Sequence, residues 1–145
     1  MATLQVVDEW ANYTAVSAGV DVDADTFKAA LTNTAPTKAG TQVLGDITQI
    51  AGTGGYAPVT LSGFSWAETG AGTGIWQLTF SPFSWTASGA DFATARYVVI
   101  YDDTASTPLK PVVGYVDYGA GFVVTNGATF TVTPGANGVL RVTVN

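Results

Sequence analysis

Two runs rich in Val, Ile and Tyr, residues 96–101 and 112–118, constrain the fold of this chain more than any other feature. β-Branched and aromatic side chains fit the pleated surface of a sheet, whereas the polar stretch between the runs, with Pro108 and Pro111, interrupts it. The two runs therefore predict a β-hairpin. Because apolar residues occupy both faces of each run, we expect the hairpin to be covered on both sides, as at the centre of a β-sandwich.

The register of this hairpin is predicted by pairing the last residue of the first run with the first residue of the second. The opposite pairs are then Tyr101–Val112, Ile100–Val113, Val98–Tyr115 and Arg96–Asp117. This register places an opposite-charge pair at the open end of the hairpin, on the face that also carries the Ile100–Val113 and Val98–Tyr115 pairs. We interpret six residues as the structural site that holds the hairpin together: Arg96, Val98, Ile100, Val113, Tyr115 and Asp117.

The rest of the chain adds shorter runs with strand periodicity, separated by turns of Gly, Pro and Asn. We expect strands at residues 26–31, 59–64, 75–80, 128–133 and 139–144, in addition to the hairpin. About eight short antiparallel strands are typical of a β-sandwich or a jelly roll. The chain of 145 residues is thus predicted to be one all-β domain, 1–145, with an antiparallel, jelly-roll-like β-sandwich over residues 20–145.

Residues 1–19 differ from the rest because the apolar residues between 3 and 17 keep helical spacing. Thr3 can cap a helix there and Gly19 is placed to end it. The pattern predicts a short N-terminal α-helix that covers one end of the sandwich; an amphipathic arm that docks on a partner is the alternative.

Charge is scarce and unbalanced in this chain. Five Lys and Arg stand against 11 Asp and Glu, for a net charge of −6, and charged residues make up 11% of the chain, against about 25% in ordinary soluble domains. The basic residues are scattered singly, which argues against a nucleic-acid partner. No apolar run approaches the ~18 residues that span a bilayer, which argues against a membrane.

So few charges leave large uncharged faces, which we expect to be covered by neighbours in a homo-oligomer or a larger assembly. The alternative is a monomer whose exposed faces are mostly Thr, Ser, Gly and Asn.

Catalysis is not expected, because the chain contains no His and no Cys. Ser-His-Asp and Cys-His nucleophile activation both need these residues, and so do most zinc sites. A glycosidase that uses two carboxylates could draw on Asp102, Asp103, Glu68 or Asp117. However, Asp102 and Asp103 begin a hairpin loop, where Asp is favoured because it bonds nearby backbone amides. We predict a protein that is not an enzyme and needs no cofactor or metal.

Two motifs resemble ligand loops without completing them. Asp21, Asp23 and Asp25 have the spacing of a calcium loop, but Thr26 and Thr32 stand where that loop needs Gly and Glu. We interpret these acids as the solvent-facing side of an extended segment. The glycine-rich residues 52–55 lack the Gly-Lys-Ser/Thr of a phosphate loop and are expected to form a turn.

Three tryptophans, Trp66, Trp76 and Trp85, could offer an aromatic platform to a sugar, which would make the chain a carbohydrate-binding module. Aromatic residues at alternating strand positions are more often core, and we expect this of all three. Trp66 lies beside loops and is the one candidate for contact with a ligand or partner.

Several segments, in this order along the chain, resemble small structural proteins of tailed-bacteriophage virions. They are the N-terminal helix and residues 25–31, 54–56, 59–61, 85–87, 95–104 and 114–119, followed by Gly127 ahead of Phe130. Ala57-Pro58 departs from the pattern, since members often carry further glycine there, and that turn is expected to differ.

The resemblance covers most of the chain and implies a β-sandwich virion protein with a strand at 26–31. It implies further that the chain is a capsid cement or decoration protein on the exterior of the head, bound to the major capsid protein. A tail or other virion component is the alternative within the same group.

Overall fold

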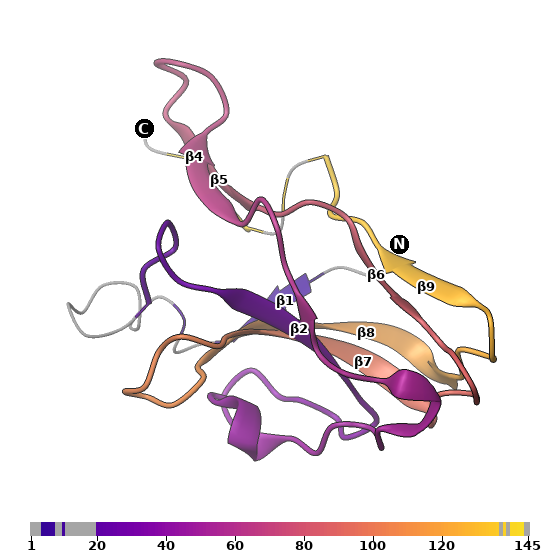
Figure 1. Cartoon of the computed structure of the whole chain (residues 1–145). Coiled ribbons are helices and arrows are strands. Elements are labelled where there is room, and N and C mark those ends of the chain that lie inside the picture. The colour runs from indigo at the N-terminus through magenta and orange to yellow at the C-terminus, as the bar shows by residue number, and fades with distance from the viewer. Residues whose placement is uncertain (1–3, 8–9, 11–19, 137, 139, 144–145) are drawn as a thin grey trace.

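The computed structural model describes residues 4–7, 10, 20–136, 138 and 140–143. Within this part the strands are β1 (Leu4–Val6), β2 (Phe27–Thr32), β3 (Val59–Thr60), β4 (Ser65–Glu68), β5 (Ile75–Thr79), β6 (Phe83–Thr86), β7 (Ala95–Asp102), β8 (Val112–Phe122), β9 (Thr129–Val132) and β10 (Leu140–Thr143). Two 3-10 turns, η1 (Leu44–Asp46) and η2 (Thr53–Gly55), complete the elements. Every strand pair is antiparallel, so the predicted all-β class is confirmed (Figure 1).

The strands form three sheets. The largest has the order β1-β8-β7-β2-β3, a second has the order β10-β5-β4, and β6 pairs with β9 alone. The predicted hairpin is present as β7 and β8 at the centre of the largest sheet, where seven of the eight residues of β7 are buried. Flanking strands on both edges satisfy its backbone, and the apolar side chains of its two faces are both covered.

The predicted register of the hairpin is wrong beyond its first pair. The observed pairs are Tyr101–Val112, Ile100–Gly114, Val99–Tyr115, Val98–Val116 and Tyr97–Asp117. Val113 is an extra residue on β8, so every later partner is displaced by one. The alternation of side chains did not reveal this bulge, because both faces of the hairpin are apolar and a shift of one residue exposes nothing.

Gly114, just after the bulge, allows β1 to approach β8 closely. A Cβ atom at Gly114 would clash with the carbonyl oxygen of Gln5 in β1. β1 pairs with β8 through Leu4–Val116, Gln5–Tyr115 and Val6–Gly114. The absence of a side chain at this point therefore lets β1 add to the sheet at close range.

The predicted N-terminal helix is wrong where it overlaps β1. Residues 4–6 are extended because they bond to β8, and this tertiary pairing overrides the helical spacing of the apolar residues. Val7 and Trp10 are buried. The other positions of the predicted helix, 3, 8–9 and 11–17, lie outside the described residues, and a helix there stays a prediction.

The other strand predictions are confirmed in part. Strands were expected and are found at β2, β5, β9 and β10, and the expected strand at 59–64 is reduced to β3. β4 and β6 were not predicted, since both are short and their Ser and Thr content is typical of loops. Residues 22–25, expected to be extended, form a turn instead.

One face of the large sheet packs against a row of aromatic rings. Contacts between rings run from Trp10 through Phe27, Phe64, Phe80, Phe83 and Trp85 to Phe130. The closest pair is Phe27 and Phe64, stacked with 3.8 Å between ring centroids. The row links the large sheet to β6 and β9. These two strands lie on one side of the large sheet in Figure 1.

The opposite face is covered by residues 42–50. This segment starts where Val112 donates its N–H to Gln42 and ends where Ile50 donates to Leu31. It therefore runs from β8 across to β2, and its residue Ile47 is buried. Thr32, whose side chain points away from the Phe27 face, donates its hydroxyl to the Thr48 carbonyl. The buried apolar residues from both faces belong to one continuous cluster.

Candidate functional site

Arg96 and Asp117 form the ion pair that the sequence predicted, although they are not opposite each other in the ladder. The Arg96 guanidinium donates to both oxygens of Asp117, with Nε–Oδ1 at 2.8 Å and Nη2–Oδ2 at 2.9 Å. Tyr97 is the residue opposite Asp117, and β8 bulges between Asp117 and Phe122. This irregularity frees Arg96 from the ladder so that it can reach the carboxylate.

The Arg96 guanidinium, with a smaller contribution from the Gly119 N–H, holds the pKa of Asp117 below its usual range. The pair remains partly exposed, with side-chain exposures of 38% and 30%.

Arg96→Ala is expected to change the urea midpoint of unfolding only slightly. An ion pair that remains in contact with water gains little net energy, because solvent screens it and two long side chains must be held in place. Equilibrium unfolding followed by Trp fluorescence measures the effect. A destabilisation as large as that of a buried apolar truncation would show that this pair, and not the core, holds the hairpin.

The four apolar members of the predicted structural site are buried as expected, but they do not form the predicted pairs. Val98 and Ile100 lie on β7 opposite Val116 and Gly114, while Tyr115 lies opposite Val99. Val113 is the bulge residue. All four are less than 7% exposed and belong to the core.

Asp102 and Asp103 have neighbouring carboxyl groups in very different surroundings. Asp102 is fully buried, and its Oδ1 accepts the N–H groups of Thr104 at 2.7 Å and Ala105 at 3.1 Å. Burial raises the pKa of Asp102 to about 6, with a smaller contribution from Asp25. Its Oδ2 has no donor among the described residues, and when protonated it can donate to Asp25.

Asp103 is held instead by two cations. Its Oδ1 lies 2.7 Å from Lys110 Nζ and its Oδ2 lies 2.6 Å from Lys28 Nζ. These contacts, that of Lys110 first, lower the pKa of Asp103. Carboxyls with opposed pKa shifts are typical of acid–base pairs. Here, however, Asp102 is sealed from solvent and holds the start of the β7–β8 loop, whereas Asp103 has a lysine on each oxygen and ties this loop to Lys28 of β2.

The remaining candidate acids also bond to their own loops. Glu68 accepts the N–H groups of Gly72 and Gly74 and so closes the β4–β5 turn. Asp21 accepts from Asp23 and Ala24. Among the residues that the structure describes, no three acids gather in a way that could hold a metal ion.

Trp66 on β4 is stacked against Trp76 on β5, with ring centroids 6.3 Å apart and an angle of 17° between the rings. Trp76 was expected in the core, but 38% of it is exposed, because β5 is covered by the core only from Leu78 onward. Trp66 is partly buried against the core. The pair therefore presents one side to solvent, with Trp76 as its more exposed member.

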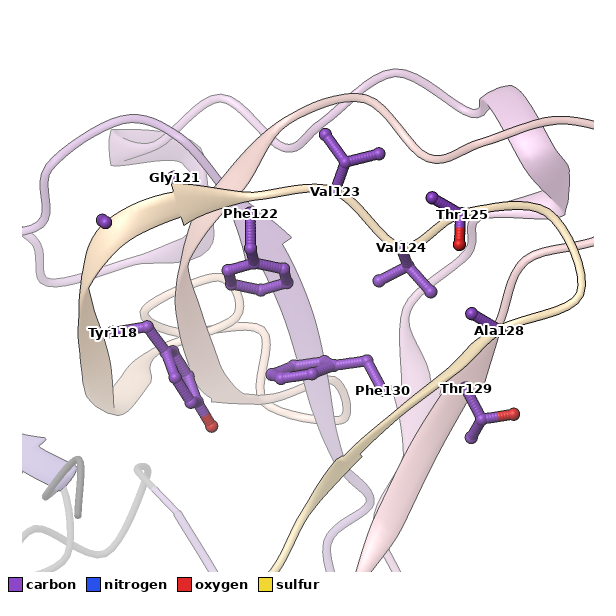
Figure 2. A pocket seen from close by; sticks show the side chains of 10 residues that line it. Tyr118, Gly121, Phe122, Val123, Val124, Thr125, Ala128, Thr129 and Phe130 are labelled. Carbon is purple, nitrogen blue, oxygen red and sulfur yellow. The ribbon is translucent and has the colours of Figure 1, made fainter.

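A hollow of about 500 Å³ lies between the end of β8 and the start of β9. Figure 2 shows Tyr118, Phe122 and Phe130 pointing toward one another within it. The Phe122 and Phe130 ring centroids are 4.6 Å apart, and Tyr118 lies 5.6 Å and 5.3 Å from them. We call this the aromatic hollow; its lining is Tyr118, Ala120, Gly121, Phe122, Val123, Val124, Thr125, Ala128, Thr129 and Phe130.

The chemistry of the aromatic hollow suits binding and not reaction. No lining residue is charged, and the hydroxyls of Thr125 and Thr129 have no base among the lining residues to activate them. Burial raises the pKa of Tyr118, so its hydroxyl stays protonated. Val123 on the rim is 46% exposed. The hollow can therefore accept an uncharged, apolar group from outside the chain.

The sequence pattern did not indicate this site, although it predicted a strand at residues 128–133, which include Phe130. Its three rings come from the far end of one strand and the start of the next. They are brought together by the bend around Gly119, which has φ of +82°. Three aromatic residues within thirteen positions, interrupted by glycine-rich turns, were the available signal.

No helix in the described part of the chain is long and apolar enough to cross a membrane. Comparison with known proteins found no matching family model, no matching curated protein sequence and no matching solved structure.

Proposed function

We propose that this chain is a non-catalytic structural protein that acts by contact with other proteins. The observation that carries this proposal is the aromatic hollow, an uncharged and partly exposed surface on a chain in which only 11% of residues are charged. Interfaces between proteins are depleted of charge at their centre and enriched in aromatic residues. The candidate acids point the same way, since each is engaged by backbone amides or cations.

Within that class, we propose a capsid cement or decoration protein on the outer surface of a tailed-phage head, bound to the major capsid protein. The resemblance of the ordered segments 25–31, 54–56, 95–104 and 114–119 supports this proposal. The net charge of −6 favours the outside of the shell, because packaged DNA would repel an acidic protein on the inside. Repeated weak contacts around the shell would then sum to firm attachment.

The proposal includes the arrangement of the sheets as a jelly-roll-like sandwich. It is supported by the aromatic row that joins the β7–β2 side of the large sheet to β6 and β9. Such a two-layer core needs no helix to cover it on that side.

Co-sedimentation tests the proposal directly. The protein is expected to pellet with expanded heads that lack it, purified from a phage that encodes the chain, and to ignore free DNA. Binding should survive moderate salt, because few of the contacts can be ion pairs. Unexpanded heads serve as the matched control. If the protein never pelleted with heads and cryo-electron microscopy located it in the tail, the proposal of a tail component would replace the cement proposal.

The Trp66–Trp76 pair favours a second candidate, a carbohydrate-binding module, because stacked and partly exposed rings can lie against a sugar. A glycan array combined with Trp fluorescence distinguishes the two. A sugar-dependent signal that is lost in both Trp66→Ala and Trp76→Ala would place this second function ahead of the first.

A further inference from the structure

β9 ends its sheet with an open edge. Its only hydrogen-bonded neighbour among the described strands is β6, and Figure 1 shows it at the outside of the molecule. Just before the β6–β9 ladder, Ala87 donates to the carbonyl of Ala128 and accepts the N–H of Gly127, so the Ala128 carbonyl points toward β6. Because antiparallel ladders alternate, the backbone groups of Thr129 and Thr131 point away from β6. Both residues are exposed.

Within its four residues, this edge lacks the charge and the proline that often prevent strands from pairing with other chains. Natural edge strands are blunted by charged residues, by proline, by bulges or by very short length. β4, at the edge of another sheet, carries Glu68, and β3 has only two residues and follows Pro58. β9 has neither charge nor proline, and it pairs with β6 without a register break.

The aromatic hollow lies next to this open edge. Phe130 belongs both to β9 and to the hollow, and Thr129 lines the hollow as well. A strand added to the edge of β9 would therefore place an apolar side chain next to Phe130, beside the hollow, while its backbone bonds to Thr129 and Thr131. One occupant would then cover both the unpaired backbone groups and the uncharged surface.

We propose that the occupant is β9 of a second copy of this chain, added antiparallel about a two-fold axis at Phe130. Thr129 then faces Thr131 of the partner, and each pair exchanges N–H and C=O bonds through the groups that point away from β6. Phe130 meets its own copy across the axis, beside the hollow. The four residues of β9 suit this self-pairing, because threonines meet threonines on one face and phenylalanines meet on the other.

The inference rests on the proposed function and deepens it by naming the interface of the homo-oligomer that the sequence predicts. Its test does not require heads, so its failure is distinct from that of the cement proposal.

Sedimentation velocity over a concentration series tests the dimer. The unmodified protein is expected to form a reversible dimer. Thr131→Pro removes an N–H that points away from β6, and Thr129→Lys adds charge to the edge; each should raise the dissociation constant at least about tenfold. Thr86→Lys is the matched control, because Thr86 lies opposite Thr129 on β6, with the two hydroxyl oxygens 2.8 Å apart, but one strand further from the edge. It should leave the dimer intact.

Cysteine cross-linking tests the register. The chain has no cysteine, so introduced thiols act without background. An oxidised mixture of Thr129→Cys and Thr131→Cys chains is expected to give disulfide-linked dimers, because these positions face each other about 5.5 Å apart at Cα. Each variant alone should give almost none, since like positions are offset by two residues. A monomer at all concentrations, or equal cross-linking by each variant alone, would overturn the proposal.

Discussion

Ile100→Ala is expected to lower the free energy of unfolding by about 2–5 kcal/mol, through lost burial and the cavity that remains. Ile100 is 1% exposed at the centre of β7, and its partners in the neighbouring strands are Ala29 and Gly114. Neither partner has a side chain that could move into the space left behind. The cost should therefore lie toward the upper end of the range, and equilibrium urea unfolding measures it.

Leu109→Ala provides the control for that measurement. It removes a side chain of the same volume from the β7–β8 loop, where Leu109 is 65% exposed, so the unfolding free energy should change little. If the two variants lost similar amounts of stability, the hairpin could not be the centre of the core.

Asp102→Asn is expected to stabilise the protein at neutral pH by up to about 3 kcal/mol. Burial raises the pKa of Asp102 from 3.8 to about 6 in the folded protein, and a difference of about two pKa units corresponds to that energy. An acid with a raised pKa contributes its full stability below pH 3.8 and loses it as the pH rises through 6. The asparagine keeps an oxygen for Thr104 and Ala105 but cannot ionise.

The pH dependence makes this prediction specific. The difference in stability between variant and wild type should be small at pH 4 or below and should grow up to about pH 7. The lowered pKa values of Asp103 and Asp117 act in the opposite direction, stabilising at higher pH, but they are present in both proteins and cancel in the difference. Urea unfolding at a series of pH values provides the data. A constant difference across the series would mean that the raised pKa of Asp102 is not real.

Asp103→Asn is the comparison variant, because it leaves Lys28 and Lys110 without their carboxylate partner. It should reduce stability at neutral pH, where Asp102→Asn increases it. Opposite signs at adjacent positions would separate the buried acid from the ion-paired one.

Strands whose side chains alternate and whose ends carry Gly, Pro or Asn were predictable from the sequence, as β5 and β9 illustrate. The register of the central hairpin was not, because valine on both faces makes the bulge at Val113 invisible to any periodicity. β1 was misassigned since its pairing partner, β8, lies more than a hundred residues away. Local spacing carries no information about such a partner.

The candidate site was predictable only in its parts. The strand that carries Phe130 was expected, and the Arg96–Asp117 pair was predicted correctly, although the register from which the pair was predicted is wrong. The aromatic hollow depends on where β8 bends beyond Asp117. That bend follows from the left-handed backbone of Gly119 and from the Gly119 N–H donated to Asp117, which are features of the folded chain and not of a repeating pattern.

The strand order of the large sheet also dictates how fast such a chain can fold. Only β7 and β8 are joined by a short loop, whereas β2 must find β7 across about seventy residues and β1 must find β8 across more than a hundred. Closing such long loops costs chain entropy before any favourable contact offsets that cost. Proteins dominated by distant pairings therefore fold in milliseconds to seconds. The β7–β8 hairpin, which can form alone within microseconds, is therefore the natural nucleus onto which the earlier strands add.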